Sequence, residues 1–153
     1  MGARAVVTVP NPVLREICTP VESFNQRLSD LTTDMLATMY EAKGRGLAAP
    51  QIGVTDRIFV MDCTWKEGET TPMVFVNPEI LSQSEETSTY EEGCLSIPGQ
   101  TTFVQRPAQV TVRWQTLEGD AREDQFGGFA ATCIQHKLDH LNGVLCTDYE
   151  GQA

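Results

Sequence analysis

The fold of this chain is decided by the stretch Gln135-His136-Lys137-Leu138-Asp139-His140-Leu141, near the end of its 153 residues. The stretch holds both histidines of the sequence, and they stand four residues apart. Because residues i and i+4 lie on one face of an α-helix, one turn apart, both imidazoles can reach a single metal ion. We therefore predict a helix that binds a metal ion through His136 and His140.

The residue after the first histidine is Lys137. In the zinc-hydrolase pattern H-E-x-x-H the two histidines have the same spacing, and the glutamate next to the first one acts as the general base. The sequence thus has the metal ligands of that pattern without its carboxylate.

Hydrophobic periodicity extends the prediction along the chain. Apolar residues at helical spacing surround the histidines, and Asn142-Gly143 is a typical helix end. A second helix is predicted from about Asn25 to Lys43, before Gly44. Short β-prone runs predict a hairpin of residues 57–61 and 73–76 and two further strands at 101–104 and 108–114. Strands between an early and a late helix indicate an α+β fold.

Prolines and glycines mark the irregular segments. Pro10-Asn11-Pro12 argues against a helix at the end of an extended N-terminal arm, and Asn77-Pro78 is expected to close the second strand of the hairpin. Residues 117–120 are expected to form a turn.

Composition and charge restrict the class of protein. With 41% hydrophobic and 21% charged residues, the sequence is typical of one globular domain spanning residues 1–153. It has neither a secretory leader pattern nor an apolar run of about 20 residues, so we expect a cytoplasmic protein. A net charge of -10 argues against nucleic acid and anionic membranes as partners. Five widely spaced cysteines, an odd number, favour free thiols.

A hydrolytic metal site needs a third protein ligand and an open fourth position. Cys94 is a candidate because it follows Glu91-Glu92-Gly93 and precedes the apolar Leu95. The residues alone leave the choice among the cysteines open, since a lone cysteine is most often a small buried apolar residue. The glycine-rich segment from Gly44 to Gln51 is either a tight connection or a place where the backbone passes close to a ligand or a strand.

Three segments resemble the sequence motifs of peptide deformylases, in the same order and at similar spacing. They are Gly44-Arg45-Gly46-Leu47-Ala48-Ala49-Pro50-Gln51, Glu92-Gly93-Cys94-Leu95-Ser96 and Gln135-His136-Lys137-Leu138-Asp139-His140. The stretch from Pro10 to Arg15 and the Asn77-Pro78 step are also similar to that family, so that the resemblance covers nearly the whole chain.

The resemblance implies a fold and a reaction. Antiparallel strands would pack around a central helix that carries the two histidines, and Cys94, His136 and His140 would bind a divalent metal, Fe(II) or Zn(II). The family removes the formyl group from the N-terminal methionine of nascent proteins. Gln51 and the backbone amide of Leu95 would polarise the formyl oxygen.

The resemblance also implies a substrate pocket. Positions matching Arg45, Phe129 and Cys133 belong to the methionine pocket of the family, and we add Gly46 and Glu92 to the residues expected to contact the substrate.

Lys137 departs from the family, whose motif has glutamate at this position. General acid–base catalysis contributes about 10²–10⁴-fold to a rate, and an ammonium cannot accept a proton. We therefore expect weak or lost deformylase activity. Burial can also favour a neutral lysine that acts as a base or binds the metal, and Lys137 could instead pair with Glu92.

Arg45 and Lys43 depart as well, because the family usually has an apolar and an acidic residue there. Either the two side chains point to solvent, or the pocket has been refitted for an anionic ligand. The alternative function is thus a non-catalytic, metal-dependent binding protein for a peptide or a small anionic ligand. If metal binding had been lost, His136 and His140 would be core residues. Family members that dock on the ribosome use a C-terminal helix beyond this stretch, so ribosome docking is not expected.

Overall fold

A computed structural model describes residues 2–150 and contains two α-helices, seven strands and four short 3-10 helices in that range. The elements in chain order are η1 (Pro12–Arg15), α1 (Gln26–Glu41), β1 (Gly46–Ala48), η2 (Ala49–Ile52), β2 (Ile58–Met61), η3 (Trp65–Glu67), β3 (Met73–Gln83), β4 (Thr87–Cys94), β5 (Ile97–Pro107), β6 (Gln109–Gln115), β7 (Ala121–Gly127), α2 (Gly128–Leu141) and η4 (Cys146–Tyr149). Within this range no helix is long and apolar enough to cross a membrane.

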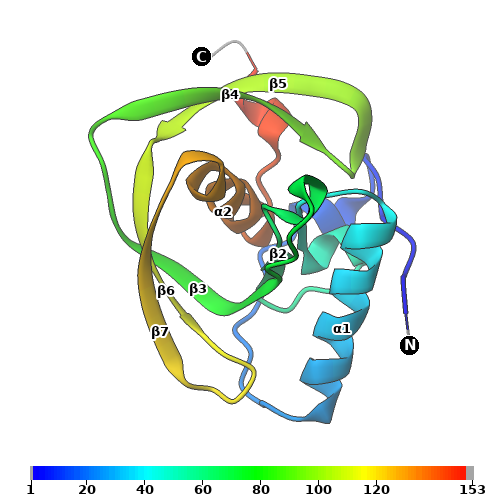
Figure 1. The fold of residues 1–153 in the computed structure, drawn as a ribbon. Coiled ribbons are helices and arrows are strands. Elements are labelled where there is room, and N and C mark those ends of the chain that lie inside the picture. Colours follow the sequence, from blue (N-terminus) through cyan, green and yellow to red (C-terminus); the bar gives the residue numbers. More distant parts are fainter. Residues whose placement is uncertain (1, 151–153) are drawn as a thin grey trace.

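The strands form two antiparallel sheets. The larger has the order β1-β2-β3-β6-β7, and the smaller pairs β4 with β5. Figure 1 shows α2 in the middle of the molecule, with the β4–β5 pair and strands β3, β6 and β7 around it and α1 on the outside. The predicted α+β fold, with antiparallel strands around a central helix, is confirmed.

The central helix α2 is buried along most of its length, because apolar residues face the larger sheet. Ile134, Leu138 and Leu141 pack in one cluster with Phe59 of β2 and Phe75 of β3. Phe59 and Phe75 stack with their ring centroids 4.6 Å apart. This packing fixes the position of the helix that carries the histidines. The other face of the helix is turned towards the smaller sheet.

The early helix α1 has the predicted stripe, and Leu28, Leu31, Met35 and Met39 are buried against β1 and β2. Its end differs from the prediction. The helix stops at Glu41, and the left-handed backbone conformation falls on Lys43 (φ 62°).

The predicted hairpin is confirmed, with Phe59 opposite Phe75 in the β2–β3 pair. In β6 the residues Val110, Val112 and Trp114 share the buried face, as the alternation predicts. The prediction that Asn77-Pro78 ends β3 was wrong. A register shift after Val76 lets the strand pass the proline and continue to Gln83.

Three strands escaped the prediction. β1 lies within the glycine-rich segment, β4 mixes polar residues on both faces, and β7 reads AREDQFG with almost every residue exposed. None of them shows the alternation of apolar and polar residues that marks a half-buried strand.

The irregular segments fall largely where expected. The turn at residues 117–120 is present, closed by the amide of Thr116 on the carbonyl of Asp120 at 2.9 Å. Residues 2–7 belong to no helix or strand. The prediction against a helix at Pro10-Asn11-Pro12 was wrong for Pro12, which begins the short 3-10 helix η1, because proline at the first helical position has no amide to leave unpaired. All five cysteines are free, as predicted.

Candidate metal centre

Two elements bring three metal-ligating side chains together. His136 and His140 stand one turn apart on α2 with their rings stacked, the centroids 5.0 Å apart. Cys94, the last residue of β4, places its Sγ 3.3 Å from Nε2 of His140. One ligand atom from each of the three residues lies within 4.8 Å of the other two. Ligands of a tetrahedral zinc ion are about 3.3–3.8 Å apart, so these side chains are placed to share one ion.

The donor atoms suit a metal better than a protein core. Nε2 of His136 is buried and has no hydrogen-bond partner within residues 2–150. In His140 the unpartnered nitrogen is Nδ1, whereas Sγ of Cys94 lies next to Nε2 of that ring. A buried polar nitrogen without a partner is costly unless something fills the site. Burial, together with the nearby charge of Lys137, lowers the pKa of His136 to about 4, and burial also lowers the pKa of His140. Both imidazoles are therefore neutral at pH 7 and able to bind a metal.

Glu92 orients one ligand from behind. Its Oε1 lies 3.3 Å from Nδ1 of His136, which leaves Nε2 of that ring for the metal. Arg106 donates to both carboxylate oxygens of Glu92, at 2.7 and 2.9 Å. Burial opposes ionisation of this carboxyl, but the hydrogen bonds from Arg106 and His136 hold its pKa below the usual range. A carboxylate bonded to a metal-binding histidine fixes the tautomer and the direction of the ring.

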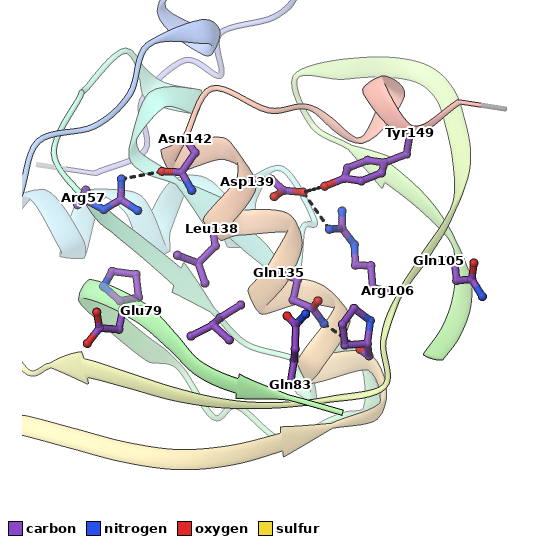
Figure 2. A pocket seen from close by; sticks show the side chains of 13 residues that line it. Arg57, Glu79, Gln83, Gln105, Arg106, Gln135, Leu138, Asp139, Asn142 and Tyr149 are labelled. Carbon is purple, nitrogen blue, oxygen red and sulfur yellow. Dashed lines mark hydrogen bonds and ion pairs between the residues drawn. The ribbon is translucent and has the colours of Figure 1, made fainter. Parts of the chain in front are cut away.

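Arg106 also connects the metal centre with the opposite side of α2. Its Nη1 donates to Asp139 at 2.9 Å, and the hydroxyl of Tyr149 donates to the same carboxylate oxygen at 2.8 Å. These residues line a second cavity of about 470 Å³ behind the helix. Figure 2 shows Arg106 and Tyr149 converging on Asp139 beside this cavity.

Lys137 points to Gln51 and does not pair with Glu92. The lysine is only 5% exposed, and its Nζ donates to Oε1 of Gln51 at 3.0 Å. The same oxygen accepts from the backbone amide of Ala48, so the Gln51 amide nitrogen is turned towards Cys94 Sγ at 3.6 Å and Ser96 Oγ at 3.2 Å. The side chain at the general-base position is thus held as a hydrogen-bond donor next to the ligand cysteine.

A pocket of about 480 Å³ opens onto this centre. Of the residues predicted to contact substrate or carry chemistry, its lining includes Arg45, Gly46, Glu92, Leu95, Phe129, Cys133 and Lys137, together with the ligands Cys94 and His136. Gln51 and His140 are fully buried and do not belong to that lining. The residues singled out from the sequence therefore gather in one region.

Sequence reasoning missed two contributors. Ser96 accepts from Gln51, and Arg106 neutralises Glu92. Ser96 stands inside the second motif, which was a usable signal. Arg106 gave none, because it meets Glu92 only through the pairing of β4 with β5.

A cysteine sulfur from β4 and two imidazoles from a helix enclosed by antiparallel strands come together beside an open pocket and form a candidate mononuclear metal site. This chain is similar to known proteins in both sequence and structure. A sequence profile of the family Polypeptide deformylase matches residues 3–152. A peptide deformylase of Afipia carboxidovorans is 51% identical over 149 residues, covering 97% of this chain and 87% of the relative.

Solved structures extend the likeness to three dimensions. Peptide deformylase from Thermotoga maritima superposes with a TM-score of 0.91 at 40% identity, covering 97% of both chains. A Met-Ala-Ser-bound class I type b peptide deformylase from Acinetobacter baumannii gives 0.89 at 36% identity, covering 95% of this chain and 97% of the other. The chain belongs to the peptide deformylase family.

Proposed function

We propose that this protein binds a divalent metal and N-formylmethionyl peptides in the manner of its family, and that it removes the formyl group slowly or not at all. The observation that carries the proposal is the hydrogen bond from Lys137 Nζ to Gln51 Oε1, 3.0 Å long. The candidate metal ligands and the substrate pocket are present. At position 137, however, a hydrogen-bond donor stands where the family has the proton acceptor.

The metal would be held by Cys94, His136 and His140 and would supply Lewis-acid chemistry at the formyl group. The Nε2 of Gln51 and the backbone amide of Leu95 would donate to the formyl oxygen as charge develops on it. Deformylation also needs a group that takes a proton from the attacking water and returns one to the leaving amine. A lysine ammonium offers three donors and no acceptor, so this chain has no such group at position 137.

Fe(II) or Zn(II) is the proposed metal, because a thiolate with two neutral imidazoles suits either ion. We propose a cytoplasmic location, which the five free cysteines support, since thiols stay reduced there. The net charge of -10 supports peptides or small ligands as partners in place of nucleic acid, anionic membranes or the ribosome.

The second candidate is a binding protein without turnover, whose ligand is a peptide or a small anion. The buried amine of Lys137 beside the metal ligands favours it, because a cation next to a metal attracts anions. In both cases the metal and the pocket are used, and the two candidates differ only in whether the amide bond is cleaved.

Turnover of formyl-Met-Ala-Ser by the zinc- or iron-loaded protein separates these functions. We expect Lys137→Glu to raise kcat/KM by about 10²–10⁴-fold over the parent chain, because it returns a proton acceptor. Lys137→Gln, which removes the ammonium without adding a base, is the matched control and should gain no comparable rate. Metal content is measured for all three proteins.

A parent chain that already deformylates as fast as Lys137→Glu would overturn the role assigned to Lys137. If neither protein cleaves the peptide although both hold metal and bind it, the function is binding alone.

A further inference from the structure

Basic side chains are concentrated around the pocket beside the candidate metal centre, although the protein as a whole is acidic. All three lysines of the sequence, Lys43, Lys66 and Lys137, line it together with Arg45. These are four of the 11 basic residues, whereas only two of the 21 acidic residues, Glu91 and Glu92, line the same pocket. The local charge is therefore opposite in sign to that of the molecule.

The two acidic residues do little to cancel this charge. Glu92 is buried, and its carboxylate is bonded by Arg106 and His136 behind the pocket. Glu91 is exposed and accepts from the hydroxyl of Thr101 at 2.8 Å. A ligand in the pocket therefore meets one exposed carboxylate and several cations.

Arg45 lies against an aromatic side chain of the pocket, and one nitrogen of its guanidinium has no hydrogen-bond partner within residues 2–150. Its Cζ lies 5.3 Å from the centroid of the Phe129 ring, a cation–π contact. Its Nε is buried and has no hydrogen-bond partner within residues 2–150. Its Nη2 lies 3.4 Å from the carboxylate of Glu67, which is 64% exposed, and ion pairs of this kind contribute little. Phe129 thus positions the guanidinium, and the weak ion pair with Glu67 leaves its charge available to a ligand.

Lys66 and Lys43 lie on two segments that are tied together. Nε1 of Trp65 donates to the carbonyl of Gly44 at 2.9 Å, which joins η3 to the turn after α1. Nζ of Lys66 lies 5.6 Å above the Trp65 ring, and Lys43 precedes Gly44 in the left-handed conformation. Both lysines are exposed where they line the pocket.

We infer that this pocket selects acidic peptides. An apolar N-terminal residue would lie by Phe129 and Leu95, and the acidic side chains that follow it would meet Lys43, Arg45 and Lys66. The inference deepens the proposed function and rests on it for the orientation of the peptide. It explains why an acidic chain concentrates its cations around one pocket, where fixed charges act on a ligand that is partly withdrawn from water.

The test compares peptides that differ only in charge. Dye-labelled formyl-Met-Asp-Asp, formyl-Met-Ala-Ser and formyl-Met-Lys-Lys are titrated with the zinc-loaded protein, and fluorescence anisotropy gives each Kd. We expect the acidic peptide to bind about tenfold more tightly than the basic one at low salt, and the ratio to shrink as salt screens the charges. Acetylated versions of the acidic and basic peptides are measured in parallel.

Charge reversal locates the effect. Arg45→Glu and Lys66→Glu should each abolish the preference, whereas Arg122→Glu makes the same change in net charge on the exposed face of β7, outside the pocket. Zinc content and thermal melting verify that each variant folds and holds metal. An equal loss in Arg122→Glu would show that only the overall charge matters and would overturn the inference.

The two proposals fail differently. Equal affinity for the acidic and basic formyl peptides overturns the charge selection and leaves the proposed function standing. If the acetylated acidic peptide binds and no formyl group is needed, charge selection stands and binding of formylmethionine does not. If no acidic peptide binds, the inference is wrong.

Discussion

Arg106 shows how a residue that is not itself a candidate ligand can support the site, because it bonds to Glu92, which contacts His136. Its guanidinium is 5% exposed and bonds to both Glu92 and Asp139, so three buried or half-buried charges depend on one another. Removing one member of a buried ion pair leaves the other uncompensated, and this is far more costly than the pair itself is stabilising.

Arg106→Met is therefore expected to lower the free energy of unfolding by about 3–5 kcal/mol. It should also weaken zinc binding by about 10–100-fold, because Glu92 would no longer be held against His136. Urea denaturation of the metal-free protein measures the first effect, and competition with a chelator measures the second.

Arg113→Met is the control. This arginine lies 3.7 Å from Glu79 on the surface, and loss of an exposed pair is expected to change stability by about 0.5 kcal/mol or less. Equal losses in the two variants would refute the special role of Arg106.

At the scale of elements, α2 is followed by a glycine that packs against the backbone of the N-terminal segment. Gly143 follows the helix with φ 77°, and a Cβ there would lie 2.5 Å from the carbonyl oxygen of Arg15. Gly99 has the same φ, but its Cβ would meet nothing within 4 Å. The two glycines thus share a left-handed backbone conformation, which would strain any other residue, and differ in packing.

Gly99→Ala is expected to cost about 1–2 kcal/mol of unfolding free energy, the cost of a left-handed alanine. Gly143→Ala should cost clearly more, because the backbone of Arg15 has to move as well. Chemical denaturation of both variants tests this difference, which would be refuted by equal midpoints.

Strand predictions succeeded where one face of the strand is buried. β2, β3 and β6 carry runs of apolar or alternating residues because they line the core. β4 and β7 are held by partner strands and present polar residues, so no period marks them in the sequence. β1 has three residues, too few for any period to show.

For the whole molecule, two neutral buried histidines make the stability of the metal-free protein depend on pH. The folded-state pKa of His136 is about 4, against 6.5 for the ordinary side chain, and burial lowers the pKa of His140 as well. The unfolded chain therefore binds protons that the folded chain does not. Stability is fully present above pH 6.5 and is lost as the pH falls towards 4.

We expect the melting temperature of the chelator-treated protein to fall continuously between pH 6.5 and 4. Replacing both histidines by glutamine should flatten the curve over this window, before the carboxylates with lowered pKa values titrate. Thermal melts of the two proteins at matched ionic strength provide the measurement. An unchanged melting temperature of the parent protein down to pH 4.5 would contradict neutral burial of the histidines.

The sequence by itself determined the two helices, the β2–β3 hairpin and the i, i+4 pair of imidazoles, because these features follow from local periodicity within one or two turns or strands. The family motifs pointed to Cys94 and Gln51, which composition alone could not separate from their neighbours.

Only the tertiary structure decided that Lys137 bonds to Gln51, while Glu92 is bonded by Arg106. It also decided that three lysines, separated by 23 and 71 positions in the sequence, line one pocket. Such contacts depend on how α2, the β4–β5 pair and the turn after α1 pack together. Packing brings residues that are far apart in the sequence within hydrogen-bonding range, and no local sequence pattern predicts which residues will meet.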